Sequence, residues 1–114
     1  VLSSMKYLIL SLAILSSLSS LSAQNLDQHM KVADAAAKKG DWDAAYTDYK
    51  VAAEMLSHKR FENRLNRQRG YAFYRMGQAA KFLALKAQRA GQQEQAEKLF
   101  EEAISYFEKC SKVQ

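Results

Sequence analysis

The sequence predicts an all-α protein, and three observations carry that prediction. Apolar residues recur at three- and four-residue spacing through long segments, which is typical of amphipathic helices. No proline interrupts the chain. Gly40 and Gly91 each separate two helical segments, and glycine often ends a helix because it takes a positive φ without steric cost. About four helices are expected, with the third elongated.

Residues 1–23 are typical of a secretory signal peptide. A Met-Lys pair gives a positive start, residues 7–15 are apolar and residues 16–23 are rich in small side chains. The apolar part is shorter than the roughly 20 residues that span a bilayer. We expect this segment to be removed, leaving a domain over 24–114 that is periplasmic or secreted and has no membrane span. A retained anchor or a buried N-terminal helix is the alternative.

The first predicted hairpin joins helices over residues 26–39 and 42–57. Asn25 is placed to cap the first helix and Asp41 the second, because both side chains accept hydrogen bonds from free N–H groups of a first turn. Gly40 ends the first helix, and so short a connection makes the two helices antiparallel. The first helix is apolar mainly through alanines, which let a neighbouring helix come close.

Residues 59–91 are expected to form the longest helical segment, as one helix or as a helix with a soft point at Gly70. From the spacing of the repeat, residues 59–69 are also expected to form a short solvated extension or a broken helix before the long helix. Its apolar residues lie in two stripes. The first stripe contains Phe61, Leu65, Ala72, Phe73, Met76, Ala80, Leu83 and Ala87, and the second contains Tyr71, Tyr74, Phe82 and Leu85. A helix that is apolar on two sides is expected to be covered on two sides. A last helix is expected over 93–112, with glutamates on its exposed side.

The two glycine bends can be superposed along the sequence. Counted from each glycine, alanines recur at matched positions before and after it, and an aromatic residue recurs nine positions later. The pairs are Ala33 and Ala84, Ala36 and Ala87, Ala45 and Ala96, Ala52 and Ala103, Tyr49 and Phe100, with Val32 and Leu83 eight residues before the glycines. We expect the alanines to mark where paired helices touch and the aromatic residues to fill the space beside them.

Around these bends the chain resembles the tetratricopeptide repeat (TPR) family. The resemblance is carried by Lys39-Gly40-Asp41-Trp42-Asp43-Ala44-Ala45 with Tyr49 and Ala52, and by Ala90-Gly91-Gln92-Gln93-Glu94-Gln95-Ala96 with Phe100 and Ala103. It implies TPR-like antiparallel helical hairpins in an α-solenoid fragment, with repeat one at about 26–59, a long helix at about 60–90 and a last helix at about 93–112. The glycines are 51 residues apart, whereas the family repeat has about 34, so the extra length falls in the long helix.

No residue pattern indicates an enzyme, a cofactor or a metal site. His29 and His58 lack partners at metal-ligand spacing. The aspartates near Asp41 lack the glycine and the closing glutamate of a calcium loop, and a helix start explains Asp41. No glycine-rich phosphate loop is present.

Charge is concentrated in residues 59–91, which contain nine basic residues and one acid. These charges are expected either to pair with acidic neighbours inside the fold or to form a surface for an acidic peptide, an anionic lipid or a polysaccharide. Nucleic acid is not expected as a partner, because the chain is predicted to be exported and shows no groove-reading motif. The proposed basic patch consists of Arg60, Arg64, Arg67 and Arg75.

The resemblance also implies where a partner would bind, because TPR ligands contact the inner face of each first helix. The positions that match are Met30, Asp34 and Ala37 in the first repeat and Lys81, Leu85 and Gln88 in the second, and Arg89 lies one turn beyond Leu85.

The leading hypothesis is therefore an exported module that binds a peptide or an envelope protein in a helical groove. Stacked repeats need about three units, so the long helix could act as a cap, a partner could complete the stack, or the protein could dimerise. A self-assembling subunit is the alternative, with the lone Cys110 either as an intermolecular bridge or as an inconsequential thiol. Polyanion binding by the basic helix is the third.

Overall fold

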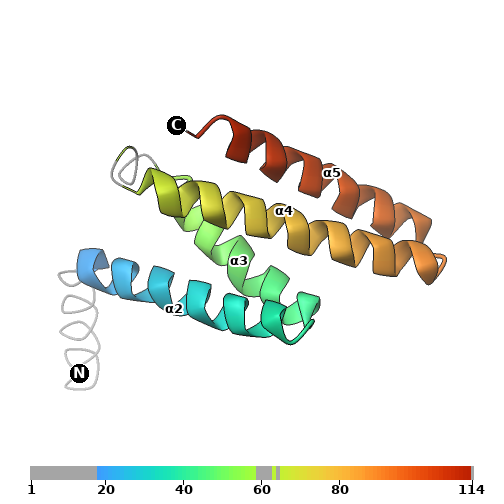
Figure 1. The fold of residues 1–114 in the computed structure, drawn as a ribbon, viewed down its shortest axis with the longest axis horizontal. Coiled ribbons are helices and arrows are strands. Elements are labelled where there is room, and N and C mark those ends of the chain that lie inside the picture. Colours follow the sequence, from blue (N-terminus) through green and yellow to red (C-terminus); the bar gives the residue numbers. More distant parts are fainter. Residues whose placement is uncertain (1–17, 59–62, 64, 114) are drawn as a thin grey trace, which may run out of the picture.

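Four helices follow one another in the computed structural model, which describes residues 18–58, 63 and 65–113, with side chains from residue 25 onward. They are α2 (Leu18–Lys38), α3 (Trp42–Leu56), α4 (Asn66–Arg89) and α5 (Gln93–Ser111). Each helix packs against the next along the chain, so the four form a stack of neighbours (Figure 1). The described residues contain no strand, and the all-α prediction is confirmed.

The two glycine bends have the same backbone geometry. Gly40 has φ +80° and Gly91 has φ +76°, so both occupy the left-handed region that favours glycine. In the first bend, Asp41 N donates to Ala36 O at 2.9 Å and Gly40 N donates to Ala37 O at 3.0 Å. These are the bonds of a Schellman motif.

The second bend repeats those bonds 51 residues later, where Gln92 N donates to Ala87 O at 2.9 Å and Gly91 N to Gln88 O at 3.1 Å. The predicted equivalence of the two bends is therefore confirmed at the backbone. The helix starts differ, because the Asp41 side chain accepts a hydrogen bond from Ala44 N at 3.2 Å while Gln92 makes no side-chain cap.

Helix α2 begins at Leu18, so Asn25 lies inside the helix and its predicted capping role is wrong. The physical reason is that residues 18–25 contain neither proline nor glycine, and an existing helix extends easily through such a segment. Residues 1–17 of the predicted signal peptide lie outside the described residues, and residues 18–23 are helical.

Helix α4 begins at Asn66, so the prediction of one helix starting at residue 59 is wrong. Asn63 has φ +70°, a left-handed conformation that asparagine tolerates better than most residues, and Leu65 has φ −120°. The helix runs through Gly70 without a break. Arg69, which was assigned to a solvated extension, is buried. Phe61 lies outside the described residues.

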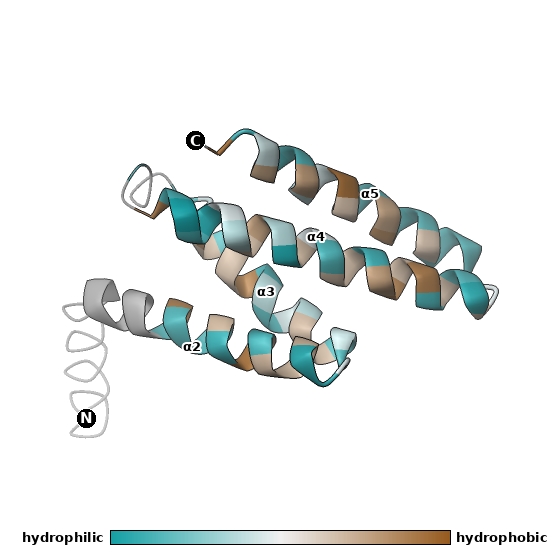
Figure 2. Cartoon of the chain, in the orientation of Figure 1, coloured by the Kyte–Doolittle hydropathy of each residue, from teal (hydrophilic) through white to brown (hydrophobic). Residues whose placement is uncertain are grey.

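The core is built from small residues, as the sequence predicts. The fully buried alanines are Ala33, Ala45, Ala52, Ala53, Ala72, Ala79, Ala80, Ala84 and Ala96. Among large side chains, Tyr49, Leu26, Leu56 and Met76 are the most deeply buried. Figure 2 shows hydrophobic and hydrophilic residues interleaved along the four helices, as expected for amphipathic helices.

Two glycines on α4 let α5 approach closely. A Cβ atom at Gly77 would lie 2.6 Å from the ring of Phe107, whereas a Cβ atom at Gly70 would lie 3.7 Å from Val113. Cys110 Sγ donates to the Gly70 carbonyl oxygen at 3.3 Å, so the thiol lies in the α4–α5 contact. The ring of Phe107 therefore occupies the place of a missing side chain.

Alanine substitutions at these two glycines are expected to change stability in opposite directions. Gly70→Ala should stabilise by about 0.5–1 kcal/mol, because alanine is the better helix former and its methyl group makes an ordinary contact. Gly77→Ala should destabilise by about 1 kcal/mol, because overpacking of about 1–3 kcal/mol outweighs the same helix gain. Urea unfolding of the two variants measures both effects.

The matched control is Gly77→Ala combined with Phe107→Leu, which removes the ring that the new methyl group meets. The cost of Gly77→Ala should be smaller in that background than in the wild type. An equal or larger cost there would show that the ring does not occupy the glycine gap in solution.

Candidate partner-binding face of helices α2 and α4

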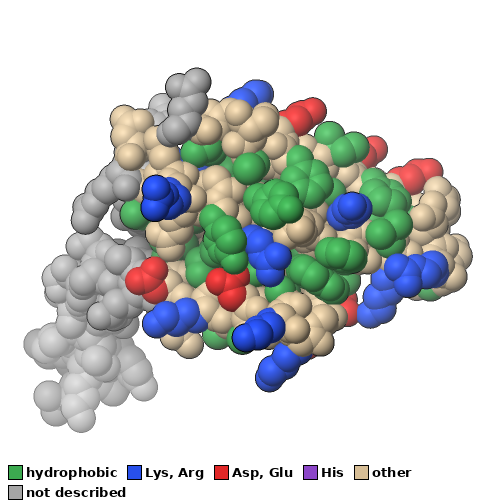
Figure 3. Space-filling model, in the orientation of Figure 1, with side chains coloured by type: hydrophobic (Ala, Val, Ile, Leu, Met, Phe, Trp, Pro, Cys, Tyr) green, Lys and Arg blue, Asp and Glu red, His purple; other side chains and the backbone are tan. Residues whose placement is uncertain are grey.

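An aromatic stripe that is partly exposed runs along α4. Tyr71 is 45% exposed, Tyr74 is 46% exposed and Phe82 is 38% exposed. The prediction that this second stripe would be covered is wrong in extent, because the side chains of α3 and α5 that contact it cover it only in part. Figure 3 shows hydrophobic side chains gathered along the middle of the molecule with Lys and Arg side chains among them.

Ring contacts hold these exposed aromatic side chains in place. The ring of Trp42, at the start of α3, stacks on Phe82 with centroids 4.5 Å apart and an interplanar angle of 21°. The ring of Tyr74 packs against Phe107 of α5 at a centroid distance of 6.0 Å. Because the rings are already ordered, a ligand that packs on them loses little additional side-chain entropy.

A polar network ties three helices together beneath this stripe. The Tyr49 hydroxyl group of α3 donates to the Asp34 carboxylate of α2. Tyr71 OH donates to the same Asp34 oxygen at 3.0 Å, and Arg75 Nε of α4 donates to Tyr49 OH at 3.0 Å. The face between α2 and α4 thus has a fixed polar floor.

Arg75 is part of this floor rather than a free charge. Its guanidinium carbon lies 5.5 Å from the ring centroid of Tyr49 and 5.7 Å from that of Trp42, within the range of cation–π contacts. Its Nη1 atom donates to Gln78 at 2.8 Å, and Gln78 in turn donates to Tyr74 OH at 3.1 Å.

Burial, and then the hydrogen bond to Asp34, raise the pKa of Tyr49 well above its ordinary value. The same two causes, in the same order, raise the pKa of Tyr71. Both phenols are therefore held in their neutral form, in which they can donate to Asp34.

The seven residues predicted at partner-binding positions are only partly on this face. Met30 is 6% exposed and Ala37 is 8% exposed, and both belong to the core, so their assignment is wrong. The physical reason is that Met30 shares a helix side with Leu26 and Ala33, and that side packs in the core. Asp34 reaches the face, although one carboxylate oxygen is already bound by Tyr49 and Tyr71.

The remaining predicted partner-binding residues belong to α4. Lys81, Gln88 and Arg89 are exposed, and Leu85 is half-buried. Sequence reasoning assigned Tyr71, Tyr74 and Phe82 to a stripe that would be covered. Their helical spacing, which groups them with Leu85 on one side of α4, was the sequence signal that could have indicated this surface.

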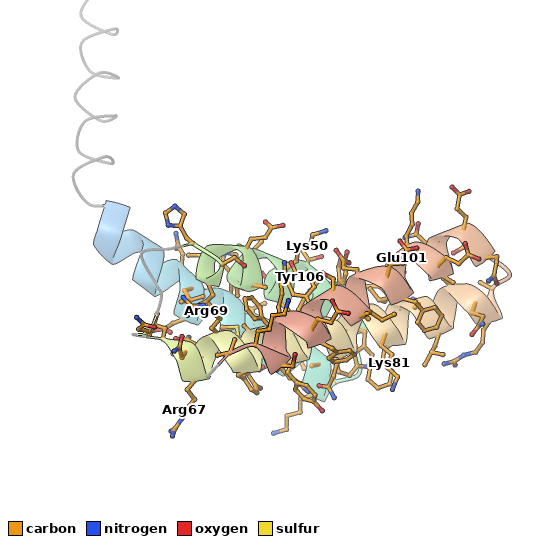
Figure 4. All side chains as sticks on the ribbon, turned by 90° about the horizontal axis from the view of Figure 1, so that it is seen from above. Lys50, Arg67, Arg69, Lys81, Glu101 and Tyr106 are labelled. Carbon is orange, nitrogen blue, oxygen red and sulfur yellow. The ribbon has the colours of Figure 1, made fainter. Side chains whose placement is uncertain are left out.

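The four arginines of the predicted basic patch do not form one patch. Arg60 and Arg64 lie outside the described residues. Arg67 is exposed in the first turn of α4, and Arg75 is half-buried in the network. Figure 4 shows Arg67 and Lys81 on one side of the molecule, so the free positive charges of this face are spread along α4.

Two lysines form ion pairs with carboxylates on neighbouring helices. Lys50 Nζ lies 3.2 Å from a Glu102 carboxylate oxygen, and Tyr46 OH donates to the other oxygen of the same carboxylate. Lys86 Nζ, from the basic segment, lies 2.8 Å from Asp43. Figure 4 shows Lys50 on the side away from Arg67 and Lys81. Arg67 and Lys81, which form no ion pair within the described residues, are thus on the side away from Lys50.

Neither a metal cluster nor a membrane-spanning helix is found among the described residues. The described residues contain no cluster of three or more His, Cys, Asp or Glu side chains that could hold a metal ion. Within the same part of the chain, none of the helices combines the length and the apolar character needed to cross a bilayer.

No protein-family model, curated protein or solved structure matches this sequence.

The Tyr49 network is expected to make stability fall at alkaline pH. A phenol whose pKa is raised by folding stabilises fully below its ordinary value of 10.0, and this stabilisation is lost as the pH rises from there toward the folded-state pKa. Above pH 10, Tyr49 alone should contribute a decline of up to about 1.4 kcal/mol per pH unit. Tyr49→Phe should flatten the decline by that amount while costing about 1 kcal/mol at neutral pH.

Urea unfolding at several pH values measures both quantities. The pKa values of Tyr46, Tyr71 and Tyr106 are also raised, so the variant should keep a residual decline. A slope identical to that of the wild type would mean that folding does not raise the pKa of Tyr49.

Proposed function

We propose that the chain is an exported, TPR-like interaction module that binds a peptide segment of an envelope protein across the face formed by α2 and α4. The observation that supports this most directly is the exposed, pre-ordered aromatic stripe of Tyr71, Tyr74 and Phe82. Surface patches of this kind, rimmed by polar residues, are typical of interaction sites. Export is inferred from the signal-peptide pattern of residues 1–23.

The repeat interpretation is supported by the equivalent bends. In a tetratricopeptide arrangement α2 and α4 would be the first helices of two hairpins, and α3 and α5 the second helices. The shared hydrogen bonds around Gly40 and Gly91 and the buried alanines beside them agree with that assignment. The inner face of the first helices is then the face that carries the aromatic stripe.

The charges on this face favour an acidic ligand with an apolar or aromatic side chain. Arg67, Lys81 and Arg89 are exposed along α4, and none of them forms an ion pair within the described residues. One oxygen of the Asp34 carboxylate is already occupied by hydrogen bonds from two tyrosines. An acidic segment would therefore be attracted to these basic side chains and would place its apolar side chain on the aromatic rings.

Two observations favour a separate partner over self-assembly. Cys110 is half-buried, with its thiol on the Gly70 carbonyl group, so an intermolecular disulfide would require the end of α5 to move. The exposed side of α5 carries Glu94, Glu97, Glu101 and Glu108, which gives the end of the stack a polar surface. Terminal units of repeat proteins have such polar outer faces.

The test is a double variant on the proposed face, Lys81→Glu with Leu85→Ala. The wild-type domain, immobilised, is used to capture partners from the envelope fraction, and the captured partner is then titrated against each variant. We expect the affinity of the double variant to fall at least about tenfold, which is about 1.4 kcal/mol.

The matched control is Lys98→Glu with Ile104→Ala on α5. It makes the same charge change at an exposed lysine and shortens an exposed apolar side chain away from the face. The control should bind as the wild type does. Equal binding by the two double variants, both folded by circular dichroism, would exclude this face.

A further inference from the structure

A second site lies where α3 and α5 end and α4 begins, and we propose that it binds a phosphate monoester of a small organic molecule. A cavity of about 460 Å³ opens there, within the size range of small-molecule pockets. It is lined by Ser57, Asn63, Asn66, Arg69, Phe73, Lys109, Lys112 and Val113. Figure 4 labels Arg69 beside the first turns of α4.

The described residues of the lining are cationic and include no acid. Arg69, Lys109 and Lys112 supply three positive charges, and none of them forms an ion pair with a described carboxylate. Lys109 Nζ lies 4.7 Å from the ring centroid of Tyr106, which holds this side chain against the helix. Positive charges gathered without a counter-charge favour an anion between them.

The described residues satisfy only part of the hydrogen-bonding capacity of the buried Arg69 guanidinium group. It is 8% exposed, its Nε atom donates to Leu56 O at 2.8 Å and its Nη1 atom donates to the Asn66 side chain. Its Nη2 atom is buried and has no acceptor among the described residues. An unsatisfied buried donor on a charged group is costly, and such exceptions commonly indicate a bound ion or water.

The start of α4 adds a second attraction for an anion. The N-cap residue is Leu65, which offers no side-chain acceptor, and the first turn contains no acidic residue. The partial positive charge of a helix N-terminus is therefore not offset by either common device. Phosphate groups bind at helix N-termini for this reason.

The C-terminal ends of α3 and α5 bring partial negative charge to the same place, and cationic side chains compensate that charge. Arg69 Nε binds the Leu56 carbonyl group of α3, and Lys109 and Lys112 are near the end of α5, where cations are favourable. Helix-end compensation thus accounts for the two lysines in part. It leaves the Nη2 atom of Arg69, which has no acceptor among the described residues, for a ligand.

The rest of the lining suits the organic part of the ligand. Phe73 and Val113 are apolar, while the Ser57 hydroxyl group and the Asn63 amide supply neutral hydrogen-bonding groups. A phosphate group alone would leave the apolar wall in contact with water. A phosphate monoester would place its phosphate near Arg69 and its apolar portion near Phe73.

The site can be tested by titrating the domain with inorganic phosphate and with phenyl phosphate at constant ionic strength. Backbone amide shifts of the first turn of α4, followed by two-dimensional NMR, report binding at the site itself. We expect shifts in that turn, tighter binding of phenyl phosphate than of phosphate, and at least a tenfold loss of affinity in the variant Lys109→Gln with Lys112→Gln.

The control is Lys81→Gln with Lys98→Gln, which removes two exposed positive charges elsewhere. It should retain the wild-type affinity for both probes. Loss of affinity equal to that of the Lys109/Lys112 variant, or the absence of shifts in the first turn of α4 at saturating phosphate, would overturn the site. Equal affinity for the two probes would overturn the assignment of an organic ester.

Discussion

The close approach of helices through small side chains is the constraint on which the rest of this structure depends. The matched alanines around the two glycine bends, except Ala36, are fully or nearly fully buried, so neighbouring helices approach closely there. Such contacts leave little space for large side chains beside them. Among the described aromatic rings, Tyr49 is fully enclosed and Phe73 and Tyr106 are buried, while Tyr71, Tyr74 and Phe82 remain on the surface of α4. The exposed aromatic face is thus a consequence of how the core is packed.

The polar network on that face joins helices that the small residues alone would leave separate. Helices α2 and α4 are connected chiefly through α3. Asp34, Tyr49 and Arg75 bridge all three, with the tyrosine hydroxyl group donating to one partner and accepting from the other. Gln68 adds a second link by donating to Asp27 at 3.4 Å. The relative position of the two helices that would contact a partner is therefore set by side-chain hydrogen bonds, which are more directional than apolar contacts.

The bends and the helical character of the chain could be predicted from the sequence because their signals are local. Glycine at a positive φ and alanines at helical spacing each identify a position without reference to distant residues. The start of α2 could not be predicted, because residues 18–25 contain no signal that ends a helix. Met30 was misplaced because helical periodicity does not tell whether a given side packs inside or binds outside.

The two candidate sites differ in how much of each the sequence could show. The aromatic stripe lies on a single helix, so its members were grouped correctly and only their exposure was missed. The Arg69 cavity draws its lining from α4, from α5 and from residues that follow α3 and α5, and Ser57 and Val113 are 56 positions apart. Only the fold brings the ends of α3 and α5 to the start of α4, so no local pattern could have indicated that cavity.

The gap at Gly77 also sets the lengthwise alignment of α4 and α5. A ring seated where a side chain is absent cannot slide along the helix, because the next positions on the same side, one turn away, are Phe73 and Lys81. A shift of α5 by one turn would drive Phe107 against one of these larger side chains. Helices α4 and α5 should therefore move together as one rigid unit. Any change of conformation on binding another chain would then occur where the hairpin of α2 and α3 meets α4.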